Sequence, residues 1–274
     1  MLNKGGADMR HAGAFIAGVG LIAGAAFAVE GARVAPLPEK VVVLTFDDAV
    51  SSQYTFVAPL LKKCGFGATF FVCEFPSSAQ DKANYLNWEQ IAELNKLGFE
   101  IGNHTRTHAH IGKISDEKIV EELNFIDEKC RDGGISKTTT FAYPGYGMNA
   151  KALPIFQERG FQFARAGGNR CYDPAKDHPY LVPSFDIAGT NELKGIGFLK
   201  QAAPGKIVVL TFHGVPDLIH PWVNTPPELF KSYMRFLKEN RYTVIAMRDL
   251  ARYADSGKAI ETLGSEWKKR FRDK

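Results

Sequence analysis

Short apolar segments alternate with amphipathic ones along most of this chain, and this alternation constrains the fold more than any other feature. Eight segments have the composition of buried strands: 41–44, 68–72, 99–102, 139–142, 161–164, 181–185, 207–212 and 242–246. Helical patterns lie between them at 52–63, 88–97, 115–132 and 149–159, and again from Pro227 and after Arg248. Continuous apolar strands separated by helices are typical of a parallel sheet that is buried on both faces. The pattern predicts an α/β fold, with seven or eight β/α units in a closed or nearly closed barrel.

The composition agrees with a single globular domain and excludes other classes. Of 274 residues, 45% are hydrophobic and only 26 are Gly and 14 Pro, which excludes disordered and collagen-like chains. The net charge of +4 is small for this length, so we expect no nucleic-acid partner. With no linker or repeat, we expect one domain over 40–255, between a segment at 29–39 and a tail at 256–274. The sequence leaves the oligomeric state open.

The first thirty residues differ from the rest. Lys4 and Arg10 precede an uncharged run at 12–28, which ends in the small-x-small sequence Ala26-Phe27-Ala28. This order predicts a secretory signal peptide over 1–28, with a retained membrane anchor as the alternative. No later segment is apolar enough to span a bilayer, so we expect a periplasmic or secreted protein with no membrane span after cleavage. Export permits disulfides among Cys64, Cys73, Cys130 and Cys171, but their spacing selects no pairing and free thiols are equally consistent with it.

Polar side chains follow several expected strands at their carboxyl ends, where the catalytic groups of β/α barrels gather. They include an acidic pair, an imidazole pair, a glycine-rich turn, an arginine and a further histidine: Asp47 and Asp48, His104 and His108, 143–147, Arg165, and His213. Because the carboxyl ends of parallel strands share one edge, we expect these groups to converge on one face.

His104 and His108 are four residues apart, so a helical turn would place both rings on one side. Two imidazoles with one carboxylate form the three-ligand set of a catalytic zinc site. One aspartate of the pair could bind the metal, its neighbour could act as a base, and His213 could protonate a leaving group. Taken alone, an acidic pair after a strand is often a helix cap and a buried histidine often serves the core, but their convergence favours a metal-dependent hydrolase.

Several motifs resemble those of the polysaccharide deacetylase family, also described as the NodB-homology or carbohydrate esterase family 4 group. TFDDA at 45–49 and HTRTH at 104–108 are similar to its first two motifs. ATFFV at 68–72 lies between them, and FAYPG at 141–145 and LTFH at 210–213 resemble variants of its third and fifth motifs. The resemblance covers about 40–250, nearly the whole expected mature chain.

The resemblance implies a distorted (β/α)7-type barrel that hydrolyses an acetamide, or sometimes an acetate ester, on a carbohydrate. It assigns Asp47 as general base and His213 as general acid. It assigns a divalent metal, most simply Zn²⁺, to Asp48, His104 and His108, a set that also accepts Co²⁺, Ni²⁺ or Fe²⁺. The amide after Pro144 would donate to the oxyanion, which places Gly145 and its neighbour Tyr146 in the site.

The chain departs from the family pattern at four positions. Ala49 replaces the usual Gly of the first motif, which is costly only if the backbone there has a positive φ. Ala142 replaces the arginine that normally holds the catalytic aspartate, and we expect Arg165 to reach Asp47 instead, or to face solvent or a substrate anion. Thr211 occupies the usual place of a leucine, which indicates either a bulge or a different pocket lining. For the missing partner of His213 we expect Asp186.

Trp222 lies in the long segment after His213 and could either stack on a sugar ring or anchor that segment to the barrel. The main hypothesis is an exported carbohydrate N-deacetylase acting on an acetylated glycan. The alternatives are an O-acetyl xylan or glycan esterase, an amidohydrolase of small amides, and a catalytically weakened envelope protein that binds carbohydrate. The sequence does not identify the glycan.

Overall fold

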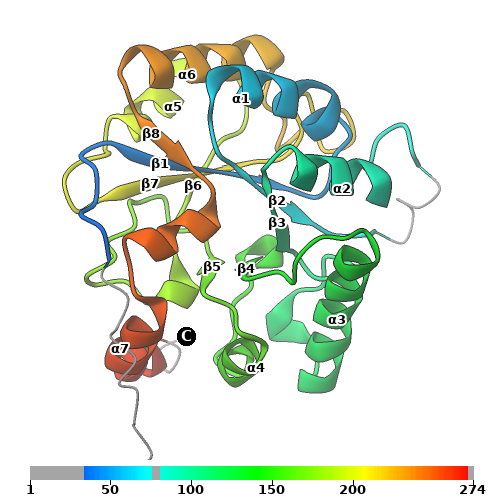
Figure 1. Cartoon of the computed structure of the whole chain (residues 1–274), viewed down its shortest axis with the longest axis vertical. Helices are drawn as coiled ribbons and strands as arrows, with labels where there is room; N and C mark the ends of the chain where they lie inside the picture. The colour runs from blue at the N-terminus through cyan, green and yellow to red at the C-terminus, as the bar shows by residue number, and fades with distance from the viewer. Residues whose placement is uncertain (1–33, 76–80, 271–274) are drawn as a thin grey trace, which may run out of the picture. The chain divides into compact units, whose positions relative to one another are not determined.

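The computed structural model describes residues 34–75 and 81–270 of the chain, and side chains as far as residue 264 (Figure 1). The expected signal peptide at 1–28 lies outside these ranges. Among the described helices, none is long and apolar enough to cross a membrane.

Eight parallel strands form one curled sheet, which confirms the expected α/β fold and the distorted barrel. In chain order they are β1 Val41–Asp47, β2 Thr69–Val72, β3 Glu100–Asn103, β4 Thr140–Ala142, β5 Phe163–Arg165, β6 Phe185–Asp186, β7 Ile207–Phe212 and β8 Thr243–Ile245. Their order in the sheet is β5-β4-β3-β2-β1-β7-β6, and β8 pairs with the start of β1. A bridge between Arg165 and Val182 connects β5 to the segment that leads into β6, so the two ends of the sheet approach each other.

Helices surround this sheet on its outer side. They are α1 Ala58–Cys64, α2 Trp88–Lys96, α3 Asp116–Asp132, α4 Ala152–Arg159, α5 Glu192–Leu199, α6 Pro227–Glu239 and α7 Ser256–Arg270. Figure 1 shows α1, α5 and α6 together on the side of the sheet that carries β1, β7 and β8. The starts of α2 and α3 follow from their caps, because the Asn87 side chain accepts from the Gln90 amide and the Ser115 side chain from the Lys118 amide.

Three elements differ from the sequence expectation. The expected strand at 181–185 is reduced to Phe185–Asp186, because Pro179 opens a 3-10 turn and Pro183 has no N–H for a strand ladder. Helix α5 has no clear sequence signal, since Gly195 and Gly197 weaken its helix propensity. Gly195 is nevertheless required there, because a Cβ would collide with the Tyr233 ring of α6. Finally, α7 occupies most of the expected tail.

The alternation of side chains along β1 separates two apolar clusters and determines the direction in which Asp47 points. Val42, Leu44 and Phe46 pack in the cluster beneath α1, α2 and α6. Val41 and Val43 face the other side, with residues of β2, β4, β5 and β7. Because side chains alternate, Asp47 continues the second set and points into the barrel interior at the carboxyl end of β1. All four cysteines are described, and each has a free thiol.

Candidate active site

A left-handed turn brings two consecutive carboxylates into one pocket. In an extended strand Asp47 and Asp48 would face opposite sides. Asp48 and Ala49 instead have φ values of 75° and 51°, and both aspartates line one pocket of about 360 Å³. Ala49 therefore has a left-handed backbone conformation that favours glycine. The alanine in the first motif consequently costs conformational free energy.

An irregular turn, not a helical one, brings the two histidines together. After β3, Thr105 and His108 have φ values of 60° and 56°. The Thr105 amide donates to Asn103 Oδ1 at 2.9 Å, and the Ala109 amide donates to Thr105 Oγ1 at 2.8 Å. The centroids of the His104 and His108 rings consequently lie 4.9 Å apart. The predicted proximity of the two rings is present, although its expected helical cause is wrong.

One oxygen of Asp48 lies between the two imidazoles. Its Oδ1 is 3.5 Å from His104 Nε2 and 3.6 Å from His108 Nε2. The three ligand atoms offered by Asp48, His104 and His108 all lie within 4.8 Å of one another. His104 Nδ1 lies 2.8 Å from the Ala142 carbonyl oxygen, to which it donates, so Nε2 is the nitrogen that presents its lone pair to the pocket.

This donor set fits a divalent cation. Asp48 Oδ1 is buried, and no described residue supplies it with a hydrogen bond. Ligands about 2.0–2.2 Å from a tetrahedral zinc ion lie roughly 3.3–3.6 Å from one another, which is the spacing around Oδ1. Two imidazoles and a carboxylate also leave a coordination position for water.

Electrostatic interactions within the cluster favour the metal-binding forms of Asp48 and His108. Burial alone would lower the pKa of His104, but attraction from Asp47 and Asp48 raises it, so a proton and a metal compete for its Nε2. Burial alone would raise the pKa of Asp48, but attraction from His104, and then from His213 and His108, holds that pKa well below its usual value. Burial, followed by repulsion from His104, lowers the pKa of His108 to about 4. Asp48 is therefore ionised and His108 neutral at neutral pH, as metal ligation requires.

Glu122 of α3 holds the turn that carries the histidines. Its buried carboxylate accepts from the Thr107 amide at 2.7 Å and from Thr107 Oγ1 at 3.0 Å. Thr107 immediately precedes His108. Sequence reasoning missed Glu122, because nothing in the periodicity of α3 separates an inward carboxylate from the exposed ones around it.

We expect Glu122→Ala to weaken zinc affinity by roughly 10-fold to 100-fold, as other residues that orient ligands do. The change leaves the Thr107 amide without its acceptor and frees the turn that places His108. Competition with a chromogenic chelator measures the affinity. Glu122→Gln, which keeps an acceptor oxygen, should retain most of it, and Glu121→Ala on the exposed face should leave it unchanged. An unaltered affinity in Glu122→Ala would contradict this role.

Arg165 reaches Asp47 across the barrel. The side chain is fully buried, and its Nη2 donates to Asp47 Oδ2. Its Nη1 donates to Thr211 Oγ1 at 2.8 Å, and Thr211 in turn donates to Ser184 Oγ at 2.9 Å. Strand β7 pairs with β1 in continuous register through Thr211, so the leucine-to-threonine departure is not a bulge but a support for the relocated arginine.

His213 enters the pocket from the end of β7 without the expected partner. Its Nε2 lies 3.9 Å from Asp48 Oδ2, whereas its buried Nδ1 has no hydrogen-bond partner among the described residues. Asp186 lines the same pocket but lies 3.5 Å from the Tyr146 hydroxyl instead, so the expected Asp186–His213 pair is absent. Asp186 pairs in register with Thr211, two residues or about 6.6 Å before His213 along the strand direction.

The turn after β4 forms the opposite wall of the pocket. Gly145 lines the pocket with a φ of 56°. The amide of Tyr146 donates to the Tyr143 carbonyl at 3.0 Å, which leaves only the Gly145 amide of this pair as a candidate oxyanion donor. The Tyr146 ring instead lies against the Arg165 guanidinium, 5.6 Å from ring centroid to Cζ.

The segment after His213 forms an aromatic rim that the sequence indicated only at Trp222. Asp217 is buried and accepts from the Gly214 and His220 amides at 3.2 and 2.8 Å. The His220 ring lies 3.3 Å from both Asp217 and the Tyr85 hydroxyl. Trp222 is 72% exposed at the pocket edge, so Asp217 and His220 anchor this segment and Trp222 does not.

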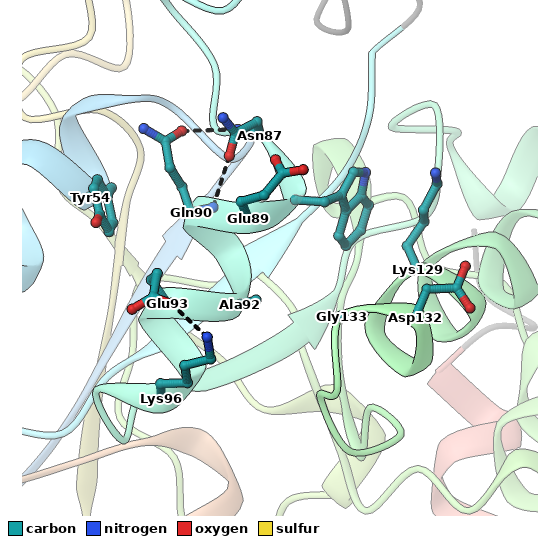
Figure 2. A pocket seen from close by; sticks show the side chains of 11 residues that line it. Tyr54, Asn87, Glu89, Gln90, Ala92, Glu93, Lys96, Lys129, Asp132 and Gly133 are labelled. Carbon is teal, nitrogen blue, oxygen red and sulfur yellow. Dashed lines mark hydrogen bonds and ion pairs between the residues drawn. The ribbon is translucent and has the colours of Figure 1, made fainter.

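A larger cleft lies outside the catalytic face, beside α2 (Figure 2). Its volume is about 560 Å³, and four of its polar residues pair with one another. Asn87 and Gln90 form the helix cap, and Glu93 pairs with Lys96 at 2.7 Å, as the dashed lines in Figure 2 show. No histidine or cysteine lines this cleft, so size alone would select the wrong site.

Comparison with known proteins identifies relatives over about half of the chain. Residues 35–164 match the family model described as polysaccharide deacetylase. The chain is 33% identical over 129 residues to a peptidoglycan-N-acetylglucosamine deacetylase of Bacillus cereus, covering 46% of this chain and 56% of that protein. It is 24% identical over 162 residues to a poly-beta-1,6-N-acetyl-D-glucosamine N-deacetylase of Staphylococcus aureus, covering 55% and 56%. The chain thus spans about half the length of these curated relatives.

Solved structures of low sequence identity share the fold. The family 4 carbohydrate esterase PdaA of Bacillus subtilis aligns with a TM-score of 0.52 at 22% identity, covering 78% of this chain and 81% of that one. The Xyl-CE4 domain of a xylanase from a termite hindgut metagenome aligns with a TM-score of 0.54 at 19% identity, covering 83% and 92%. The family model thus assigns residues 35–164 to the polysaccharide deacetylase family, and the solved structures show the same fold over most of the chain.

Proposed function

We propose that this protein is an exported, metal-dependent hydrolase that removes acetyl groups from an N-acetylated carbohydrate. The observation that carries the proposal is the meeting of Asp48, His104 and His108, with Asp47 and His213 in the same pocket. A carbohydrate-binding protein would not need an acid, a base and a ligand set together. The expected signal peptide and the peptidoglycan named for one relative support a place of action outside the cytoplasm.

Each residue of the pocket has a chemical task in this proposal. Asp48, His104 and His108 would hold the cation, most simply Zn²⁺, whose charge lowers the pKa of water and polarises a carbonyl. Asp47, kept in place by Arg165, accepts the proton of the attacking water. The Gly145 amide donates to the oxygen that becomes negative, and His213 Nε2 gives a proton to the departing amine.

The substrate class follows from the chemistry of the relatives and the shape of the rim. Two relatives are named for N-acetylglucosamine polymers, so we propose an N-acetylhexosamine glycan. The ring faces of Phe75, His220 and Trp222 beside the pocket suit the apolar face of a sugar. The Arg165–Asp47 contact argues against a catalytically weakened carbohydrate-binding protein, because it supplies the arginine that the third motif lacks.

Acetate release tests the proposal. The purified protein, loaded with zinc, is incubated with chitooligosaccharide, de-O-acetylated peptidoglycan, poly-N-acetylglucosamine and acetylated xylan, and acetate is measured enzymatically. Release from N-acetylated glycans that stops with a chelator and returns with zinc is the expected result. Release from xylan alone would indicate the O-acetyl esterase, and zinc binding without release from any glycan would refute the proposal.

We expect Trp222→Ala to raise KM roughly 5-fold, since a stacked indole contributes about 1 kcal/mol, with kcat and Tm unchanged. In this proposal the exposed ring contacts the substrate, and its described ring contact is to His220 of the same segment, so its loss should weaken binding alone. Steady-state kinetics on chitooligosaccharide measures the effect. Leu218→Ala is the matched control, because Leu218 lies in the same segment and is 80% exposed but does not line the pocket. Equal effects in the two variants would remove Trp222 from the binding site.

A further inference from the structure

The imidazole of His110 occupies the space in which residue 147 would carry a side chain. Three of its ring atoms would lie within 3.0 Å of a Cβ built on Gly147, closer than real Cβ atoms approach their neighbours. The ring also lies 3.7 Å from the Cβ position of Gly145. His110 therefore packs directly against the backbone of the turn that carries the Gly145 amide.

This contact joins two turns that the sheet itself connects weakly. His110 ends the irregular turn that carries His104 and His108, whereas Gly145 and Gly147 belong to the turn after β4. The strands beneath these turns, β3 and β4, pair in register only through Asn103 and Phe141. Above that pair, the His104 ring donates to the Ala142 carbonyl, and the His110 ring packs against the backbone of the candidate oxyanion turn.

Hydrogen bonding at Nδ1 does not explain the position of the His110 side chain. Its Nδ1 is buried, and no described residue accepts from it or donates to it. A buried nitrogen without a partner costs about 1–3 kcal/mol, a penalty that an apolar ring of similar size would avoid. The ring is thus held for its shape and position, and its position lies between the two turns.

We propose that His110 is a positioning residue that fixes the oxyanion turn relative to the metal-ligand turn. The proposal rests on the proposed function for the roles of the two turns. If the ring fixes the Gly145 amide relative to the cation site that includes His108, displacement of the ring should disturb the amide and the cation site together. A misplacement of about 1 Å can lower a rate about 100-fold.

A mutant cycle between the ring and the glycine tests this coupling. Gly147→Ala forces the methyl group into the ring, and we expect kcat to fall about 100-fold and zinc affinity about 10-fold, with KM little changed. His110→Ala alone should lower kcat about 10-fold. In the double variant the methyl group has room, so kcat and zinc affinity should return to within about threefold of the His110→Ala values.

Two controls separate positioning from general destabilisation. Gly197→Ala on α5, where a Cβ meets nothing within 4 Å, should change neither kcat nor zinc affinity. His110→Phe keeps a planar ring and should retain kcat better than His110→Ala. Additive losses in the double variant, or a His110→Ala variant with unchanged kcat and zinc affinity, would overturn the proposal. If the wild-type protein releases no acetate, the proposed function fails, while the same cycle in zinc affinity still tests the coupling.

Discussion

Asp47→Asn should lower kcat for acetate release by about 10²-fold to 10⁴-fold, the range for loss of a general base. The amide has nearly the size of the carboxylate and still accepts from Arg165, but it cannot take a proton from water. Zinc affinity should stay within about threefold of the wild type, because the three ligands remain in place. Steady-state kinetics and chelator competition on the same preparation measure the two effects.

Asp186→Asn provides the matched control for this prediction. Asp186 is a carboxylate of the same pocket, yet its described polar side-chain contact is to the Tyr146 hydroxyl and not to the ligand cluster. Its loss should therefore change kcat less than about threefold, the level of a peripheral contact. An Asp47→Asn variant as active as Asp186→Asn would assign the base to another group.

Arg165→Ala should destabilise the protein by about 3–5 kcal/mol, because it leaves the buried Asp47 charge without its partner. The same change frees Asp47 to rotate, so kcat should fall at least about 10-fold in the fraction that stays folded. Denaturant-induced unfolding measures the free energy of unfolding. Steady-state kinetics at denaturant concentrations well below the midpoint of that unfolding transition measures kcat. Turnover close to the wild-type value would show that Arg165 does not position Asp47.

The double variant Asp47→Asn/Arg165→Met distinguishes an unpaired charge from a packing defect. With both charges removed and the volume of the arginine largely kept, we expect most of the lost stability to return, although activity stays low. Arg165→Lys should recover only part of the activity, since an ammonium group cannot reach Asp47 and Thr211 together as the guanidinium fork does. If the losses in stability from the two substitutions simply add in the double variant, the effect of Arg165 on stability comes from packing alone.

The sequence predicted the site best where strand periodicity determined side-chain direction. The apolar run of β1 indicates where this strand begins and ends. Parallel pairing then brings the residues at the carboxyl ends of β1, β3, β4, β5 and β7 to one edge of the sheet. The link from Arg165 to Asp47 could be anticipated for the same reason, because the residue that ends a strand of a small barrel can reach across its interior.

The remaining features depend on backbone conformations and contacts that have no sequence period. The left-handed residues Asp48, Ala49 and His108 are not glycines, so composition did not reveal them. The anchoring of the rim by Asp217 and His220 depends on a contact between His220 and Tyr85, which lies 135 positions earlier in the chain. Asp186 was misassigned because its offset from His213 follows from the register between β6 and β7, which a single sequence does not fix.

The guanidinium that contacts Asp47 comes from β5, the strand next to the one on which the motif resemblance led us to expect an arginine. Ala142 and Arg165 are register partners on β4 and β5, so the observed arginine lies one strand away from the expected position and still contacts Asp47. A genomic survey that demands an arginine at the position of Ala142 will discard chains like this one as inactive. Screening for a basic residue at the position of either Ala142 or Arg165, together with a hydroxyl at the position of Thr211, would recover them.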